Sequence, residues 1–418
     1  MKRYINRLIE KTIEAELNAL GCIAIEGPKW CGKSTTGARF AKKIIKLQNP
    51  ITYRQYLAYA TTSKENLLEG DKPLMFDEWQ KIPDLWDFIR TDIDETGLSG
   101  QYILTGSAKP VEDQNRHSGT GRISKITMRT MSLWESGDSS GEVSLSSLFD
   151  GNDSIFGESK LSLNEIAVVI CRGGWPETVL KEEHYQTLVS AYFKSLTTED
   201  IVDVDGIKRN PSRAQAILRA YARNISTFAT NKTLQSDVAS NDSTIDMKTL
   251  ISYIGAFEKL FVIENIKAWS PKLRSKTTIR TADKRQFVDP SIAAVALGAK
   301  PYDLINDLNI MGFFFESLCH RDLKVYAQSI GGELYQYKDA DGLEVDSIIH
   351  LNDGRWGAIE IKLGGAEIDE AANNLIKLKN KIDQKLKGPS FLMVLTAVPA
   401  AYKREDGVLV VPIACLKN

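Results

Sequence analysis

The sequence lacks several features that would place it in a simple class. Its five cysteines include no CxxC pair, so we expect no zinc site, and an odd number of scattered thiols is typical of a reducing compartment. No apolar run approaches the roughly 18 residues that a membrane span requires. The charged N-terminus is not followed by the apolar core of a secretory signal. These absences predict a cytoplasmic protein with no membrane partner.

The chain also lacks an excess of charge of either sign. It has 53 Lys and Arg against 54 Asp and Glu, which leaves a formal net charge of −1. A protein that coats nucleic acid or membrane with its whole surface is therefore not expected, although one basic segment is compatible with this balance. The length of 418 residues, 43% of them apolar, predicts two or three globular domains.

The first third of the chain alternates between helical and strand-like patterns, which predicts a parallel α/β sheet covered on both faces. The expected elements are a helix over residues 3–20, strands at Cys22–Ile25, Pro73–Phe76 and Gln101–Thr105, and a helix over Lys33–Leu47.

A phosphate-binding pattern lies between the first expected strand and the helix after it. The segment Gly27-Pro28-Lys29-Trp30-Cys31-Gly32-Lys33-Ser34, followed by Thr35, fits GxxxxGK[ST]. In such a loop the glycines allow a tight path, backbone N–H groups face the phosphates, Lys33 reaches them as a point charge and Ser34 places its hydroxyl on Mg²⁺. The helix that follows is expected to add its positive dipole end. ATP and Mg²⁺ are thus the expected ligands.

Two further strand ends support this prediction. Leu74–Phe76 leads into Asp77 and Glu78, and in P-loop ATPases the first such acid holds Mg²⁺ and the second polarises the attacking water. The next strand ends in Thr105-Gly106-Ser107, where a hydroxyl can sense the γ-phosphate. Ser107 is our candidate for this sensor, although the pattern alone does not tell which hydroxyl points inward.

Hydrolysis also needs a cation for the transferring phosphoryl group. Arg122 is our first candidate for an arginine finger that acts across a subunit boundary, and Arg129 is the second. A plain surface arginine is the alternative for each. A finger in trans favours a ring, but the sequence leaves the oligomer open.

The middle of the chain changes in composition. Residues 136–162 are rich in Ser, Gly and Asp and predict a linker or insertion, and helical patterns resume over 163–268. Residues 231–269 suit a winged helix. After it, Lys267–Arg285 contains seven basic residues and one acid, with Lys272, Arg274, Lys276 and Arg280 alternating with small residues, which predicts contact with DNA phosphates. The alternative is a solvated hairpin in a protein-interaction domain.

The last segment carries a second acidic pattern. Strands are expected at Glu333–Tyr337, Val345–Leu351 and Trp356–Ile361, after a helix over Met311–Val325. Asp346 is followed fourteen residues later by Glu360-Ile361-Lys362, and a side-chain period of two places Glu360 and Lys362 on one face. These three residues, with Glu316 from the helix, would form a Mg²⁺-dependent phosphodiesterase site. The alternative is a strand with alternating charges.

As a set, these segments resemble a family of prokaryotic AAA+-type ATPases whose C-terminal half is a domain of unknown function. The resemblance rests on Gly27–Thr35, Asp77–Leu85, Leu104–Ser107, Gly173–Glu177, Phe287–Pro290, and Gly332-Glu333 with Glu344–Asp346 and Glu360–Lys362. It implies an ATP-binding domain, a winged helix and a C-terminal fold similar to PD-(D/E)xK restriction endonucleases. Val345 stands where that nuclease signature has Pro, and Trp30-Cys31 departs from the commoner loop residues.

The resulting prediction has four parts: a P-loop AAA+-type ATPase at 1–135, a Ser/Gly-rich insertion and helical lid at 136–225, a winged-helix-like module at 226–299 and a restriction-endonuclease-like domain at 300–418. The predicted function is ATP hydrolysis coupled to a DNA-binding, nuclease-like half. The alternative is a nucleotide-dependent switch for a protein partner, with a silent nuclease-like fold.

Overall fold

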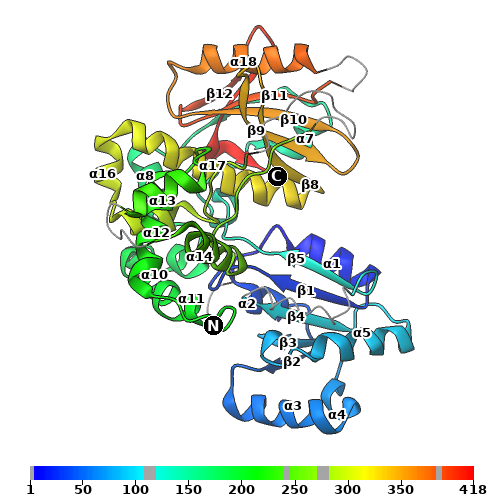
Figure 1. Cartoon of the computed structure of the whole chain (residues 1–418). Coiled ribbons are helices and arrows are strands. Elements are labelled where there is room, and N and C mark those ends of the chain that lie inside the picture. The colour runs from blue at the N-terminus through cyan, green and yellow to red at the C-terminus, as the bar shows by residue number, and fades with distance from the viewer. Residues whose placement is uncertain (1–3, 108–118, 240–244, 271–281, 383–387) are drawn as a thin grey trace.

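The computed structural model describes residues 4–107, 119–239, 245–270, 282–382 and 388–418. Figure 1 shows an N-terminal α/β region in blue and cyan, helices in green and yellow, and a C-terminal sheet in orange and red that joins strands from elsewhere in the chain. None of the helices in these ranges combines the length and the apolar character needed to cross a membrane. All five cysteines are buried, free thiols.

The N-terminal sheet is parallel and has the strand order β2-β3-β4-β1-β5. Its three inner strands are apolar runs that are buried on both faces, as parallel strands require, whereas the two edge strands are partly exposed. The strands are β1 (Cys22–Glu26), β2 (Lys43–Lys46), β3 (Leu74–Asp77), β4 (Tyr102–Gly106) and β5 (Ile123–Thr127). β4 therefore lies between β1 and β3, and the carboxyl ends of all three meet at one edge of the sheet.

The predicted helix over Lys33–Leu47 is wrong in length. α2 (Lys33–Gly37) has five residues, and the chain then turns into β2, where Ile44-Ile45 pairs with Met75-Phe76 of β3. Two adjacent β-branched residues fit the pleated edge of a sheet better than a helix. The sheet is covered by helices and one 3₁₀ turn: α1 (Glu10–Ala19), α3 (Pro50–Thr62), α4 (Lys64–Leu68), η1 (Trp79–Lys81) and α5 (Leu85–Thr96).

The middle region is helical, as its sequence pattern predicted. It includes one π-helical turn, η3, at the end of α10. Its elements are α6 (Leu133–Ser136), α8 (Leu163–Arg172), α9 (Pro176–Leu180), η2 (Glu182–His184), α10 (Tyr185–Ser195), η3 (Leu196–Asp200), α11 (Ile201–Asp203), α12 (Pro211–Arg223), α13 (Asn231–Ala239), α14 (Met247–Lys259), α15 (Pro290–Leu297) and α16 (Pro301–Asn306).

The C-terminal region is a mixed sheet with the order β7-β12-β13-β11-β10-β9-β8 between two helices. Its buried residues alternate between two cores: Ile349 and Ile359 pack on the side of α17, whereas Ile348 and Ala358 pack on the side of α18. The elements are α17 (Leu308–Ser329), β8 (Gly332–Lys338), β9 (Glu344–Leu351), β10 (Trp356–Lys362), α18 (Ile368–Lys381), β11 (Leu392–Thr396), β12 (Ala400–Lys403), β13 (Leu409–Pro412), η4 (Ile413–Cys415) and β14 (Leu416–Lys417).

The Ser/Gly-rich segment 136–162 was predicted to be a linker or an insertion, and the linker alternative is wrong. Its β6 (Val143–Ser144) pairs with β14, and its β7 (Gly157–Glu158) pairs with β12 at the edge of the C-terminal sheet. Between them lies α7 (Leu145–Phe149), whose apolar residues are buried. Small polar residues here form caps and turns between short elements, so their composition resembles that of a linker.

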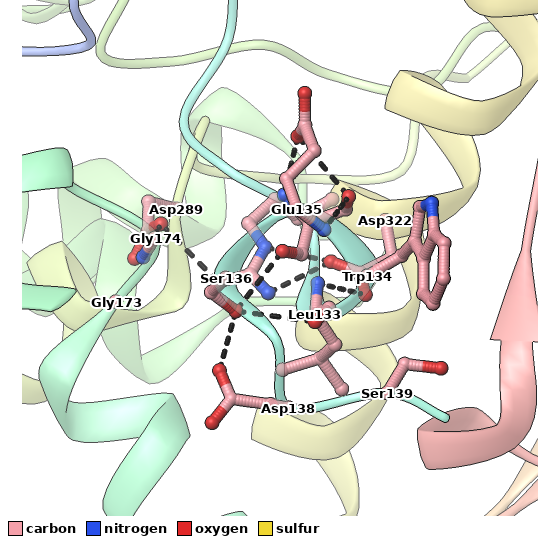
Figure 2. Close-up of polar contacts among 12 residues, drawn as sticks. Leu133, Trp134, Glu135, Ser136, Asp138, Ser139, Gly173, Gly174, Asp289 and Asp322 are labelled. Atoms are coloured by element: carbon pink, nitrogen blue, oxygen red, sulfur yellow. Dashed lines mark hydrogen bonds and ion pairs between the residues drawn. The ribbon is translucent and has the colours of Figure 1, made fainter. Parts of the chain in front are cut away.

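Two of the segments that carry the family resemblance, Gly173–Glu177 and Phe287–Pro290, meet where the regions join (Figure 2). Asp289 accepts a hydrogen bond from the backbone N–H of Gly174 at 2.9 Å, and Asp322 of α17 accepts one from that of Leu133 at 2.9 Å. Any side chain at Gly174 would collide with the backbone, because a Cβ there would lie 2.0 Å from the carbonyl oxygen of Met131. These residues therefore hold the N-terminal region, the helices and α17 together.

Candidate functional sites

The loop Gly27–Ser34 leaves the carboxyl end of β1 along a path that only glycine can take at its start. Gly27 has a φ of 151°, and a Cβ there would lie 2.1 Å from the carbonyl oxygen of Met128. Gly32, which precedes α2, has a φ of 104°. The pattern GxxxxGK[ST] thus has the backbone role that its two glycines indicate.

Lys33 lies inside this loop. Its ammonium donates hydrogen bonds to the carbonyl oxygens of Gly27 at 2.8 Å and Pro28 at 2.6 Å. The predicted contribution of a helix dipole is small, because the helix that Lys33 begins has only five residues. The charge of Lys33 and the loop N–H groups must therefore supply most of the attraction for an anion.

Asp77, the last residue of β3, contacts side chains from α2, from β4 and from the segment after β2. Its Oδ1 accepts hydrogen bonds from the hydroxyls of Ser34 and Thr105, both at 2.6 Å, and its Oδ2 accepts one from the Gln48 side chain. Asp77 is buried, with 1% of its surface exposed. Sequence reasoning missed Gln48, because it follows β2 in the segment that was predicted to be a helix.

Glu78 is held separately from Asp77, although the two are adjacent in the chain. Its φ of 59° and ψ of 48° place it in the left-handed region, which costs a non-glycine residue about 1–3 kcal/mol. Its Oε2 accepts hydrogen bonds from the Ser107 hydroxyl at 3.1 Å and from the Gln80 side chain. The question of which hydroxyl points inward is thus answered for both: Thr105 contacts Asp77 and Ser107 contacts Glu78.

The tip of the loop contacts the middle helices. The Lys29 ammonium lies 2.5 Å from Oδ1 of Asp200, the last residue of the π-helical turn η3. The Trp30 ring lies 5.5 Å from the Tyr192 ring of α10, and Trp30 also has a left-handed backbone, with a φ of 70°. π-Helical turns often occur at functional sites, and this one lies directly against the loop.

The two candidate arginines have different environments. Arg122 precedes β5 at the amino end of the sheet, opposite the loop, and its Nε lies 2.6 Å from Asp94. Arg129 is held inside the protein, where its guanidinium binds both carboxylate oxygens of Glu264 and reaches Gln328 of α17 at 2.6 Å. Arg129 therefore joins three regions, and Arg122 could approach a nucleotide only in another copy of the chain.

The four residues of the predicted nuclease-like site lie near one another in the C-terminal region. Ile359 pairs with Ser347, so Glu360 and Asp346 are the next residues of their strands. The Lys362 ammonium lies 3.4 Å from Glu360 and 3.9 Å from Asp346. Glu316 of α17 is the fourth residue, and its carboxylate is linked to Asp346 through a further side chain.

That side chain is Lys284, which sequence reasoning counted only as part of a basic run. Its ammonium lies 2.7 Å from Glu316, 3.0 Å from Asp346 and 3.6 Å from Glu344. Burial disfavours the ammonium, but the carboxylates of Glu316 and Asp346 raise the pKa of Lys284 above its ordinary value. No local sequence signal separates Lys284 from the rest of that run, because its burial comes from contacts with residues far along the chain.

Burial and neighbouring charges shift the pKa values of these acids in different directions. Burial opposes ionisation of Asp346, but Lys284 and Lys362 hold its pKa below the ordinary value. Burial, and then the charge of Asp346, raises the pKa of Glu360 well above its ordinary value. Burial also raises the pKa of Glu316 to about 7, although Lys284 favours its carboxylate. The same surroundings thus favour the carboxylate form of Asp346 and the protonated form of Glu360.

The predicted basic surface is only partly described. Lys284 points into the acidic centre, and Arg285 donates to the carbonyl oxygen of Ala229 at 2.9 Å and to Asn231 at 2.7 Å, so neither points to solvent. The predicted phosphate contacts Lys272, Arg274, Lys276 and Arg280 lie outside the described residues, as does the turn 240–244. The two predicted helices of the winged helix are present as α13 and α14, and Ile263 and Ile266 bridge to Phe287 and Lys284. The winged-helix fold itself stays a prediction.

The two acidic centres differ in whether their residues fit Mg²⁺. At the N-terminal loop, a hydroxyl and a carboxylate already meet without a competing cation, which fits a nucleotide with Mg²⁺. At the C-terminal centre an ammonium lies against the oxygens that a metal would need. The described ranges contain no group of three or more His, Cys, Asp or Glu side chains arranged to hold a metal ion.

Comparisons with known proteins divide the chain into three segments. Residues 21–136 match the family described as AAA domain, and residues 164–303 and 311–416 match two domains of unknown function, DUF8612 and DUF4143. A search of curated proteins gave no match.

Solved structures give only distant similarities. A Walker-type ATPase of Pyrococcus abyssi has a TM-score of 0.42 and 15% identity, over 70% of this chain and 96% of its own. A RuvB variant of Thermotoga maritima has a TM-score of 0.28 and 14% identity, over 61% and 88% of the two chains. A DNA replication initiation factor has a TM-score of 0.25 and 13% identity, over 60% and 92%.

Similarities this low carry no argument about function. The family match is different, because it covers the segment that contains the loop Gly27–Ser34, Asp77, Glu78 and Thr105. Residues 21–136 thus combine a parallel α/β sheet with a match to the AAA domain model, and the loop and the acids of the candidate site lie within this segment.

Proposed function

We propose that this chain binds ATP with Mg²⁺ at the loop Gly27–Ser34, hydrolyses it, and passes the nucleotide state to its middle helices. The observation that carries the proposal is the contact between Ser34 and Asp77 at 2.6 Å. These are the residues expected to share Mg²⁺ in a P-loop ATPase, and the fold brings them together across 43 residues of sequence.

The other residues of the site have roles that follow from their contacts. Lys33 would turn from the loop carbonyls to the β- and γ-phosphates. Glu78 would accept a hydrogen bond from the attacking water, and Ser107 and Gln80 keep its carboxylate in place. Thr105 would position Asp77. When bound, Mg²⁺ would neutralise charge on the phosphates.

The loop tip gives a direct route from the nucleotide to the rest of the chain. A phosphate in the loop would change the surroundings of Lys29 and Trp30, which contact Asp200 and Tyr192. Because η3 and α10 belong to the segment 164–303, a change at the loop would reach the helices without passing through the sheet. Arg122 remains our candidate finger, and its position requires a neighbouring copy.

A second candidate function is the nucleotide-dependent switch for a protein partner. Lys284 favours it, because an acidic centre that already contains an ammonium does not support a metal-dependent nuclease. In the first candidate function, the change that the loop passes to the helices would instead act on DNA bound by α13, α14 and the segment that follows them.

The substitution Lys33→Ala tests the ATPase proposal. We expect ATP turnover by the full chain to fall by about 100-fold or more, because the loop loses the ammonium that would reach the phosphates. Lys42→Ala, at an exposed lysine of the same segment, is the matched control and should leave turnover unchanged. Turnover that survives Lys33→Ala would end the assignment of this loop.

The two candidate functions are separated by turnover with and without DNA. Stimulation by DNA that Lys33→Ala abolishes would favour the DNA-coupled ATPase. Slow turnover with tight retention of nucleotide, unaffected by single-stranded, double-stranded or branched DNA, would favour the switch.

A further inference from the structure

The C-terminal centre contains a cation that belongs to the chain itself. The Lys284 ammonium contacts Oε1 of Glu316 at 2.7 Å and Oδ1 of Asp346 at 3.0 Å, and only 2% of its side chain is exposed. A divalent metal at this centre would need the same two oxygens. The ammonium and a metal therefore compete for one position.

A second lysine also pairs with the acids of this centre. The Lys362 ammonium approaches the centre from the other side, 3.4 Å from Glu360 and 3.9 Å from Asp346, and Oδ2 of Asp346 also accepts the backbone N–H of Ile361 at 3.0 Å. Two lysines thus face the buried acids of this centre. A divalent cation added to them would bring unfavourable like charges close together in a buried site.

The backbone fixes Lys284 in this position on both sides. Lys284 and Ile266 exchange two backbone hydrogen bonds, each of 3.0 Å, and the next residue exchanges bonds of 2.8 Å with Ser226 and Thr227. Two residues later Gln286 reaches Nδ1 of His320 at 2.9 Å, and the opposite ring nitrogen lies 3.3 Å from the carbonyl oxygen of Asp346. Lys284 is therefore part of the fold and not a surface side chain that entered a vacant pocket.

We infer that Lys284 is the resident cation of this centre and replaces the divalent metal that a nuclease-like fold would use. The ion pairs tie the segment 282–289, which follows the middle helices, to β9 and α17 of the C-terminal region. The acids here therefore have a structural role, because they hold the segment 282–289 against the C-terminal region. Removing the ammonium should expose a divalent-cation site that the native chain does not offer.

Binding of Mn²⁺ to the full-length, nucleotide-free chain tests this inference, with free Mn²⁺ followed by electron paramagnetic resonance. We expect wild type and Asp346→Asn to bind the same number of Mn²⁺ ions. Lys284→Met should bind one more, and Lys284→Met with Asp346→Asn should lose it again. Any ion at the N-terminal loop is common to all four proteins and cancels.

Lys338→Met is the matched control. Lys338 contacts Glu344 and lies over the same Phe228 ring as Lys284, but the structure gives it no contact with Asp346. It should bind no additional Mn²⁺.

Two results would overturn the inference. The first is a wild-type chain that loses one Mn²⁺ on Asp346→Asn, which would show that the native centre takes the metal. The second is a folded Lys284→Met that gains none. If Lys284→Met does not fold, Lys284→Gln replaces it, and the comparison of wild type with Asp346→Asn decides the matter without either variant.

Discussion

The two acidic centres of this chain are built alike but surrounded differently. Each places an acid of one strand beside the end of a neighbouring strand, Asp77 in the parallel N-terminal sheet and Asp346 in the mixed C-terminal sheet. Around Asp77 the partners are the neutral donors Ser34, Thr105 and Gln48. Around Asp346 the partners include the ammonium groups of Lys284 and Lys362.

This difference decides which cation each centre can accept. Neutral hydroxyl and amide donors can turn away from a carboxylate at the cost of a hydrogen bond, about 0.5–1.5 kcal/mol each. Separating a buried ammonium from a buried carboxylate leaves both charges unpaired, which costs about 3–5 kcal/mol. We therefore expect the N-terminal centre to accept a metal and the C-terminal centre to exclude it.

The largest effect is expected on ATP turnover at the N-terminal centre. Glu78→Gln removes the carboxylate that would polarise water, so we expect ATP turnover to fall by roughly 10²- to 10⁴-fold with nucleotide affinity kept. Single-turnover kinetics and fluorescent-nucleotide binding measure the two quantities. The exposed Asp71→Asn is the control, and loss of binding in Glu78→Gln would mean that Glu78 has a structural role instead.

The next effect concerns the stability of the C-terminal centre. Lys284→Met leaves Asp346 and Glu316 without their ammonium, so the free energy of unfolding should fall by about 3–5 kcal/mol. The more exposed pair of Lys338 with Glu344 should cost about 1 kcal/mol or less when Lys338→Met breaks it. Urea unfolding compares them. Equal losses would show that the buried pairs have no special role.

A further prediction concerns how the stability of the chain depends on pH through Glu264, which pairs with Arg129 and Lys324 where the N-terminal and C-terminal regions meet. Burial opposes ionisation of Glu264, yet Arg129 and Lys324 lower its pKa from 4.5 to about 2. A pKa that is lower in the folded chain contributes stability above the unfolded value, and this contribution is lost as the pH falls from about 4.5 to about 2. We expect about 2–3 kcal/mol from this group at neutral pH.

Unfolding of Glu264→Gln at pH 7 and at low pH measures this contribution. The variant should be less stable than wild type at pH 7, and the gap between the two should narrow as the pH falls. Glu183→Gln, at an exposed glutamate paired with His184, should change neither value. If the difference in free energy of unfolding between wild type and Glu264→Gln does not change with pH, the ion pairs of Glu264 are not its cause.

The smallest effect on stability is expected at Arg122. Its pair with Asp94 is exposed and screened by solvent, so Arg122→Ala should hardly change the free energy of unfolding. If Arg122 is a finger in trans, turnover should nevertheless fall, and only under conditions in which the chain self-associates. Arg90 also contacts Asp94, at 3.1 Å, so Arg90→Ala is the control that should leave turnover intact. Unchanged turnover in Arg122→Ala would rule out Arg122 as an arginine finger.

Local pattern predicted much of the fold, and its errors have physical causes. The strands around Asp77 and Asp346 were found, because each is a short apolar run next to a turn signal. The helix over Lys33–Leu47 was predicted too long, since pairing with β3 outweighs the helical pattern around Ile44-Ile45. The segment 136–162 was interpreted as a linker or an insertion, because pairing with β12 and β14 cannot be seen from composition.

Within the sites, residues close together in sequence were predictable and distant ones were not. The loop Gly27–Ser34 and the pair Asp77-Glu78 have their chemistry within a few residues, so spacing alone points to their roles. Gln48 and Asp200 carry no such signal, because they reach the loop and its acids from other elements. Lys284 was hidden in a run of basic residues that favoured a solvent-exposed surface.

The sequence by itself determined the nucleotide loop, because a phosphate cradle is a local backbone path that two glycines, a lysine and a serine specify. It also determined that two strands near the C-terminus place Asp346, Glu360 and Lys362 together. Only the tertiary structure decided what the acids there contact. Lys284 reaches Asp346 across 62 residues of sequence, and the choice between an ammonium and a metal depends on which charged group the packing of distant segments brings within about 3 Å of the carboxylates.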